Sequence, residues 1–261
     1  FGVKVYVTLN TLLYDEEYDE AVRLAHELYA VGVDAFIIQD ERLAERLSDL
    51  PLHSSTQMDN RDAAKVKSLL QKGFLQTVLA RELTIDEIRS IHEAVPEMPL
   101  EVFVHGAVCV CYSGCCYASE VCYGRSANRG ECAQFCRMPY TLEDAEGKPL
   151  ASGHLLSMKD MNRTDDLEAL LDAGVTSLKI EGRLKDVAYV KNVTAWYRQH
   201  LDALFRRRSE YRRSSLGHET FFFTPDIERT FQRGYMDYFM RGRTADISRS
   251  EERRVGKECR S

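Results

Sequence analysis

Apolar positions in the first 200 residues recur with two periods, which alternate along the chain. Short runs rich in Val, Ile, Phe and Thr predict strands, and stretches with apolar residues three and four apart predict amphipathic helices. The predicted strands are 2–10, 35–39, 53–58, 77–81, 101–107 and 177–181. The predicted helices are 16–31, 41–47, 61–71, 85–94 and 187–205. Thr84, with Glu87 three residues later, forms the capping box expected where a helix begins.

Repeated strand–helix units with short connections predict an α/β fold with a parallel sheet, either a barrel or a doubly wound sheet. Several strands end in polar residues, as at the active-site face of a (β/α)8 barrel. These residues are Asn10, Gln39, Asp40, Thr56, Gln57, Arg81, Glu82, His105, Glu181 and Arg183. Because six units are visible where a barrel needs eight, we expect a TIM-like (β/α)8 barrel that is truncated at its amino terminus. No Gly-rich phosphate fingerprint follows a strand, so the usual nicotinamide or ATP site is not indicated.

The chain divides into three predicted segments: a barrel over 1–205, a basic linker with the start of a carboxyl-terminal region over 206–248, and a non-native tail over 249–261. The tail lacks periodicity and resembles translated vector sequence, and the chain begins without Met, so we expect an internal fragment of a longer protein. Residues 206–261 hold 14 Lys and Arg against 9 Asp and Glu. Their basic run, 206–213, is either a solvated helix end or a phosphate contact.

Composition indicates a soluble, cytoplasmic enzyme with a packed core, because 44% of residues are apolar and 29% are charged. A net charge of −6 argues against a generic polyanion binder. No apolar run approaches the roughly 18 residues needed to cross a bilayer, so no membrane partner is expected. The sequence does not predict an oligomeric state.

Seven of the eight cysteines lie within 28 residues, from Cys109 to Cys136. This cysteine-rich stretch forms an expected insertion over 108–158, after the fifth predicted strand. Cys109, Cys116, Cys132 and Cys136 are separated by six, fifteen and three residues, a spacing that lets four thiolates reach one metal centre. We rank an iron–sulfur cluster first, structural zinc second, disulfides third and a single catalytic thiol fourth. Disulfides rank low because there is no secretory signal.

Charged residues near the cysteines and at strand ends are the remaining candidates. Arg125, Arg129 and Arg137 flank the cysteines and could stabilise an anionic cluster, bind an organic acid or RNA phosphate, or simply lie on a surface loop. Lys179, Glu181 and Arg183 alternate, which places them on one side of the last strand. They form either a structural Lys–Glu pair or a substrate site. His105 and Arg81, at strand ends, are weaker candidates.

The cysteine-rich stretch also carries a family resemblance. EVFVHGAVC over 101–109, Gly114-Cys115-Cys116, Ser119, GRSANRGECAQ over 124–134, the KD pair at 159–160 and SLKIEGRLK over 177–185 are similar to the signature of the collagenase-like peptidase family U32. The resemblance covers about residues 2–205. Departures occur at Ala118, Cys115 and Asn162; some relatives have a ligand cysteine near the last of these, which suggests that Cys136 is the fourth ligand here.

The resemblance implies a TIM-like barrel and, for several members, an oxygen-independent hydroxylation activity that depends on a [4Fe–4S] cluster. Such members act on ribosomal RNA, on a tRNA wobble uridine or on the ubiquinone ring, and prephenate is linked to the RNA reactions. The segment over 124–137 resembles the ribosomal RNA branch most. We therefore expect an RNA partner and a small organic acid, with Glu181, Arg183, Lys179 and His105 as catalytic candidates and Arg125, Arg129, Arg137 and Arg81 as substrate-binding candidates.

Two other classes of function remain open. A thiol peptidase needs a His beside its Cys, but four residues of strand separate His105 from Cys109 by roughly 13 Å. A zinc peptidase of the HExxH type is not indicated, because the motif is absent. A zinc-stapled binding module would hold one zinc ion and catalyse nothing.

Overall fold

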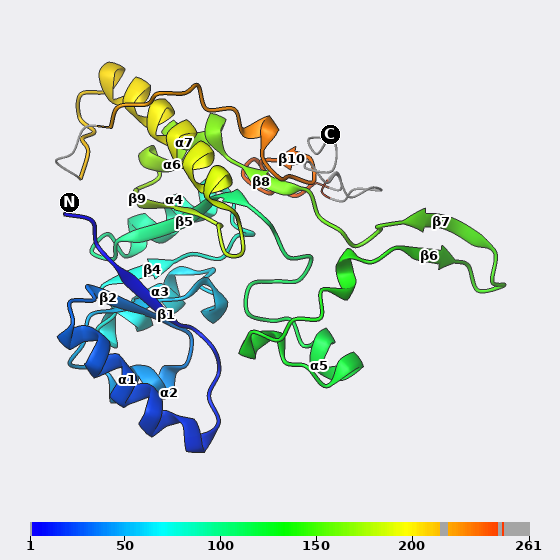
Figure 1. The fold of residues 1–261 in the computed structure, drawn as a ribbon, viewed down its shortest axis with the longest axis horizontal. Helices are drawn as coiled ribbons and strands as arrows, with labels where there is room; N and C mark the ends of the chain where they lie inside the picture. The colour runs from blue at the N-terminus through cyan, green and yellow to red at the C-terminus, as the bar shows by residue number, and fades with distance from the viewer. Residues whose placement is uncertain (1, 215–218, 245–246, 248–261) are drawn as a thin grey trace.

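The computed structural model describes residues 2–214, 219–244 and 247, which form a mixed α/β fold around a largely parallel sheet (Figure 1). The non-native tail predicted over 249–261 lies outside the described residues. The strands of the main sheet are β1 Tyr6–Leu9, β2 Ala35–Ile38, β3 Leu52–Ser54, β4 Gln76–Val78, β5 Leu100–Gly106, β8 Asp160–Asn162, β9 Val175–Ile180 and β10 Tyr235–Met236. The α-helices are α1 Tyr18–Ala30, α2 Glu41–Arg46, α3 Ala63–Gln71, α4 Ile85–Ala94, α5 Ala118–Tyr123, α6 Leu167–Asp172 and α7 Val187–Arg207.

Strands β1 to β5 pair in sequence order, and β9 continues the parallel sheet beside β5. The end of β5 also pairs antiparallel with β8, which in turn pairs with β10. The prediction of a parallel sheet is therefore confirmed. In the part of the chain that the structure describes, β1 does not pair with β9 or β10, so closure into a barrel is not seen.

The predicted elements correspond closely to the observed ones through β5, and again at β9 and α7. The predicted capping box is present, since Thr84 Oγ1 accepts from Glu87 N at 3.2 Å and Glu87 Oε2 accepts from Thr84 N at 2.8 Å. The strands predicted over 2–10 and 77–81 extend beyond the observed β1 and β4, and the strand predicted over 53–58 is also too long. It ends at Ser54 because Ser55 caps the 3₁₀-helix η2 Thr56–Met58. Strand β8, which begins at Asp160, is not among the predicted strands.

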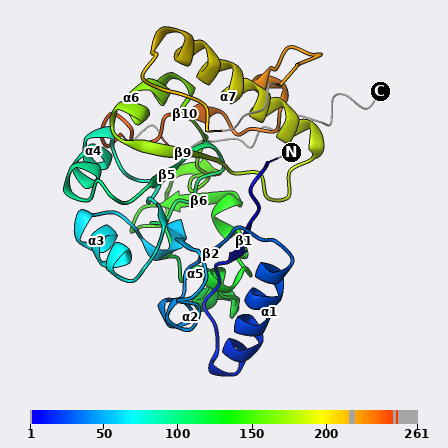
Figure 2. The same cartoon turned by 90° about the vertical axis from the view of Figure 1, so that its left-hand side faces the viewer.

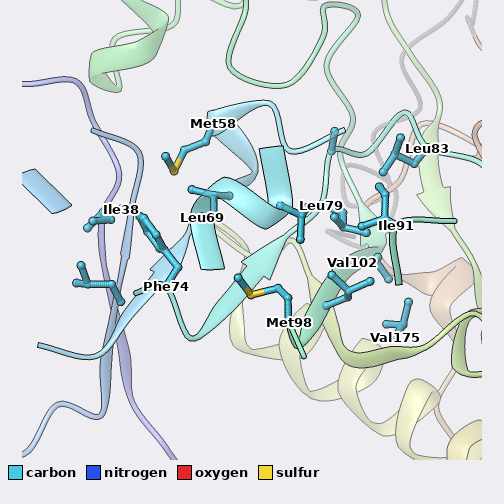
Figure 3. Packing of buried hydrophobic residues seen from close by; sticks show 14 of the residues in the cluster. Ile38, Met58, Leu69, Phe74, Leu79, Leu83, Ile91, Met98, Val102 and Val175 are labelled. Atoms are coloured by element: carbon cyan, nitrogen blue, oxygen red, sulfur yellow. The ribbon is translucent and has the colours of Figure 1, made fainter. Parts of the chain in front are cut away.

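Helices α1, α3, α4, α6 and α7 lie around the outside of the strands (Figure 2). Their inner faces pack with the strands into one main hydrophobic core, seen in part in Figure 3, where Phe74, Leu79 and Met98 meet Val102 and Val175. All five of these side chains are at least 97% buried. Burial of a side chain of this size contributes roughly 1.5–3 kcal/mol, so the core holds the sheet while loops at the strand ends carry the polar groups.

The segment between β5 and β8 leaves the body of the molecule. It contains α5 and a hairpin of β6 Tyr140–Glu143 and β7 Pro149–Gly153, which projects outward (Figure 1). Glu146 and Gly147 lie in the turn that joins the two strands of this hairpin. The chain after α7 returns to the body, where Ile227 and Met240 join the core. No helix in the described ranges is long and apolar enough to cross a membrane.

Candidate functional site

A pocket of about 1260 Å³ opens at the carboxyl ends of the parallel strands. Each strand of the parallel sheet supplies a lining residue at or just beyond its carboxyl end. These residues include Thr8, Ile37, Ser55, Arg81, Ala107 and Glu181. The segment over 108–137 forms one wall, and residues 182–192 and 229–233 form another. This is the end of the sheet at which α/β proteins place their active sites, because the polar loops converge there around a rigid frame.

Two contacts fix the cysteine-rich wall to the sheet. Glu82, which is 6% exposed, accepts from Ser113 N at 2.7 Å and from Ser113 Oγ at 3.1 Å. Next to it, Gly114 has φ +75° and lies so close to Gln57 that a Cβ on Gly114 would fall 1.8 Å from the Gln57 carbonyl oxygen. Glycine is required here for both its backbone angle and its small size.

Two arginine side chains also attach the cysteine-rich segment to other parts of the protein. Arg137 donates to the carbonyl oxygens of Val108 and Met158, at 2.5 and 2.8 Å, so it joins the two ends of the segment. Arg129 forms a bidentate ion pair with Glu17, with both distances 2.7 Å. That pair lowers the pKa of Glu17 to about 2. Of the three arginines predicted to bind substrate in this segment, Arg137 lines the pocket, whereas Arg125 and Arg129 do not.

Five thiols line the pocket, including all four that the spacing singled out. They are Cys109, Cys111, Cys116, Cys132 and Cys136. Cys115 and Cys122 lie outside its lining, and Cys115 approaches Asp59 instead, at 3.7 Å. In the part of the chain that the structure describes, no cysteine donates to or accepts from a histidine ring, so a thiol–imidazole pair is not formed.

The electrostatic environment of the thiols has two opposing parts. Burial raises the pKa of Cys109 and Cys136, and proximity to neighbouring cysteines adds to the effect. Burial followed by a hydrogen bond with Cys116 raises the pKa of Cys111 to about 11. The positive charges of the Arg81 and Arg137 guanidinium groups offset part of this rise at Cys109, so its pKa is lower than burial alone would make it. Several thiolates can coexist here only if cations compensate them, which is the condition for ligating a metal centre.

Thiolates are the donors of two kinds of metal centre. A single zinc ion needs every sulfur within about 2.3 Å of one point. Within the described ranges, no group of three or more Cys, His, Asp or Glu side chains is placed to hold one ion. A four-iron cluster is larger, and its ligand sulfurs lie further apart around it. The thiols of this wall are the kind of donors that an iron–sulfur cluster requires.

Paired charges lie at the strand ends opposite the thiols. Arg81 donates to Glu181 at 3.1 Å and lies over the Phe103 ring, 4.0 Å from its centroid. Lys179 pairs with Glu101 at 2.8 Å, which is the structural Lys–Glu contact considered above, although with a different Glu. Because β9 ends at Ile180, Glu181 and Arg183 lie beyond the strand, so the expected alternation of three charges along it is wrong.

His105 lies behind the pocket rather than in its lining. Its ring is 2% exposed and is surrounded by Tyr189, Tyr197 and Tyr235, with ring centroids 5.3–6.0 Å away. Burial lowers the pKa of His105 to about 4, so the imidazole is neutral at pH 7. In this position it supports β5 and can affect the pocket only through the surrounding tyrosines.

Two residues that the sequence did not single out are prominent here. Arg163 is buried and donates to the carbonyl oxygens of Phe103, at 3.0 Å, and Arg81, at 2.8 Å, so it joins β5 to the loop after β4. Lys185 lines the pocket, 4.0 Å from the centroid of the Phe231 ring. Arg163 gave no local signal, because its partners are 60 and 82 residues away. Lys185 ends the SLKIEGRLK segment and could have been considered.

Comparison with known proteins agrees with the signature in the cysteine-rich segment. The model for peptidase family U32 matches residues 1–250. The 23S rRNA 5-hydroxycytidine C2501 synthase of Escherichia coli K12 is 53% identical over 249 residues, covering 95% of this chain and 38% of that protein. The tRNA hydroxylation protein P1 of Bacillus subtilis is 33% identical (78% and 50% covered), and a collagenase of Porphyromonas gingivalis W83 is 30% identical (92% and 60% covered). The chain thus spans between 38% and 60% of the length of these relatives.

Proposed function

The chain belongs to peptidase family U32, and from this membership we propose that it is the cluster-binding part of an RNA-modifying enzyme that hydroxylates a base of ribosomal RNA. The observation that carries the proposal is that one pocket has both a wall of thiols and a group of cations in its lining. The names of the relatives support the choice of reaction, since two of the three refer to RNA hydroxylation. We further propose that the parallel sheet is part of a TIM-like barrel and that the enzyme works in the cytoplasm.

Cys109, Cys116, Cys132 and Cys136 would hold a [4Fe–4S] cluster. The group supplies one-electron redox chemistry when bound. Arg137 has two roles in this proposal. It stabilises thiolate charge at Cys109, and its bonds to Val108 and Met158 hold the two ends of the segment together. Cys111 lines the same wall and is the candidate to replace a lost ligand.

The remaining candidates bind and orient the substrate. Glu181 and Arg81 fix each other at the mouth of the strand ends, where the carboxylate can accept from an exocyclic amino group and the guanidinium can contact an oxyanion. Lys179 and Arg183 add positive charge to the lining. This charge suits RNA phosphate and also the carboxylates of a small organic acid such as prephenate, which we propose as a co-substrate. His105 would act as a support for β5 rather than as an acid or base.

The alternative activity, hydrolysis of peptide bonds, lacks its geometric requirement. A cysteine nucleophile needs a base within hydrogen-bond reach, and none of the described cysteines has a histidine partner. The collagenase name of one relative is the observation in favour of this activity.

Iron content and the visible spectrum of protein purified without oxygen provide the test. We expect roughly four irons per chain with broad visible absorption, and a large loss of both in Cys116→Ala. Cys122→Ala is the matched control, because that thiol is exposed and outside the pocket. Zinc in place of iron would support a structural staple. A folded protein that binds no metal and cleaves peptides would support the peptidase function instead.

The RNA part of the proposal is tested by nucleoside mass spectrometry of 23S rRNA from a strain that lacks its own hydroxycytidine synthase. The chain is placed in the strain within its full-length protein. Restored hydroxycytidine with the Cys122→Ala protein but not with Cys116→Ala is expected. No hydroxycytidine with the unmodified protein would exclude this base as the target.

A further inference from the structure

The turn between β9 and α7 has an unusual backbone for its sequence. Leu184 has φ +63°, in the left-handed region where residues other than Gly, Asn and Asp are strained. Its side chain is 94% exposed, so burial does not offset that strain. Gly182, Arg183, Leu184 and Lys185 all line the pocket. Such strain without a packing benefit is typical of binding sites.

The left-handed residue separates two cations that have no acidic partner. Among the residues described, neither the Arg183 nor the Lys185 side chain forms an ion pair. The three carboxylates of the pocket lining are each engaged elsewhere: Glu82 with Ser113, Glu181 with Arg81, and Asp186 with Tyr189 N at the start of α7, at 2.7 Å. The pocket lining holds seven Lys and Arg side chains against these three carboxylates. The turn therefore presents two cations without an ion pair among the described residues, although the charges of Asp160, Glu181 and Asp186 act on Lys185 from further away.

Aromatic rings hold Lys185 in place. Its Nζ lies 4.0 Å from the centroid of Phe231 and 5.2 Å from that of Tyr189. Burial is the largest cause that lowers the pKa of Lys185. A half-buried ammonium group over two rings loses part of its hydration, and an anion that binds it recovers the lost stabilisation.

We propose that the turn formed by residues 182–185 binds a phosphate group of the RNA strand, next to the nucleotide whose base enters the pocket. Arg183 and Lys185 donate to the phosphate oxygens, and the exposed Leu184 packs against the neighbouring nucleoside. The inference rests on the proposed function, because it assumes that RNA is the substrate. The inference adds a contact that would position the RNA strand while the base lies between the turn and the thiols.

Two features favour a phosphate over the carboxylate of a small acid. The turn is at the outer edge of the pocket, as the exposure of Leu184 shows, and an extended polyanion can follow that edge without entering. In addition, the two cations stand on either side of Leu184 as separate donors. A phosphate group has enough oxygens to accept from the Lys185 ammonium group and from the Arg183 fork at the same time.

The test measures RNA affinity as a function of salt, with a short labelled single-stranded RNA and fluorescence anisotropy. Each phosphate contact contributes about 0.7 to the slope of log K against log salt for a single strand. We expect Lys185→Gln and Arg183→Gln each to lower the slope by about 0.7 and the affinity at low salt by roughly threefold to tenfold. Lys67→Gln on α3 removes the same charge from an exposed site outside the pocket lining and should change neither.

Leu184→Gly provides a second, independent measurement. Glycine adopts the left-handed angle without strain, so thermal stability should not fall, while RNA affinity decreases with the slope unchanged. Slopes for the two cation variants equal to that of Lys67→Gln would overturn the inference and leave the RNA function standing. Failure of the unmodified protein to bind RNA would overturn both. Unchanged RNA binding with lost calorimetric binding of malonate would identify a small-acid site and refute the phosphate assignment.

Discussion

The substitution Gly114→Ala should detach the cysteine-rich wall from the sheet. The new methyl group would lie 1.8 Å from the carbonyl oxygen of Gln57, which is backbone and cannot rotate away. One side must move by about 1.6 Å to reach an ordinary contact distance of 3.4 Å. Any such movement pulls Ser113 from Glu82 and breaks hydrogen bonds to a buried carboxylate, at 2.7 and 3.1 Å.

The size of the effect follows from a matched glycine. Gly124 also has a positive φ, +63°, but a Cβ there meets nothing within 4 Å. Gly124→Ala therefore costs only the left-handed backbone, about 1 kcal/mol. Gly114→Ala has the same backbone cost and also loses bonds to a charged group, each worth roughly 1.5–3 kcal/mol. We expect a difference of at least about 2 kcal/mol in the opening of the segment, or roughly 30-fold more of the open form.

Thiol labelling, followed at Cys116 by mass spectrometry, measures this opening, because the Cys116 side chain is half-buried in the pocket wall. Both variants are compared with the unmodified protein under native conditions, and circular dichroism confirms that the sheet remains folded. Gly114→Ala should label roughly 30 times faster than Gly124→Ala and retain less iron. Equal labelling rates for the two variants would show that the contact with Gln57 does not hold the segment, and the reasoning would fail.

Two further predictions concern the support behind the pocket. Arg163→Met leaves the carbonyl oxygens of Phe103 and Arg81 without their donors, so it should lower the free energy of unfolding in urea by about 3 kcal/mol or more. Arg163→Lys should recover less than half of that loss. An unchanged free energy of unfolding in Arg163→Met would contradict this role. His105 is neutral when folded, with a pKa of about 4 against 6.5 when unfolded, so the unfolded chain binds the extra proton between these values. The free energy of unfolding should therefore fall by about 3 kcal/mol as the pH drops from 6.5 to 4, and this part of the fall should be missing in His105→Asn. Equal pH profiles of stability for the unmodified protein and His105→Asn would refute the assignment.

The sequence predicted the elements whose signals are local. The apolar runs of β2 and β5, the amphipathic helix α7 and the capping box at Thr84 depend on residues within one turn or one strand of each other. The family resemblance, confirmed by the match over residues 1–250, likewise came from a continuous motif. Strand β8 was missed because three residues, Asp-Met-Asn, contain no periodicity, and their pairing depends on β5, more than 50 residues earlier.

Side-chain partners were harder to predict than elements. Arg125, Arg129 and Arg137 look alike in the sequence, yet one is exposed, one pairs with Glu17 and one bridges two carbonyl groups. Their different roles depend on which backbone groups, far away in the sequence, lie close to each side chain in the fold. The spacing of residues along the sequence does not contain this information. A structural Lys–Glu pair was one of two alternatives, and it forms with another glutamate: Lys179 pairs with Glu101 on β5, whereas Glu181 pairs with Arg81, beyond the end of β4. The roles assigned to all these residues stay predictions until variants are measured.

The cysteine-rich segment rests on the core without contributing much to it. From 108 to 137 its buried residues are Val108, Ser113, Ser119 and Asn128, and β5, which precedes it, is buried along its whole length. A segment with so few buried apolar contacts can open as a small cooperative unit while the sheet stays closed. A cofactor could therefore be inserted into the finished protein, or repaired after oxidative damage, without global unfolding. Maturation would then be limited by the local opening rate, which hydrogen exchange over this segment would report.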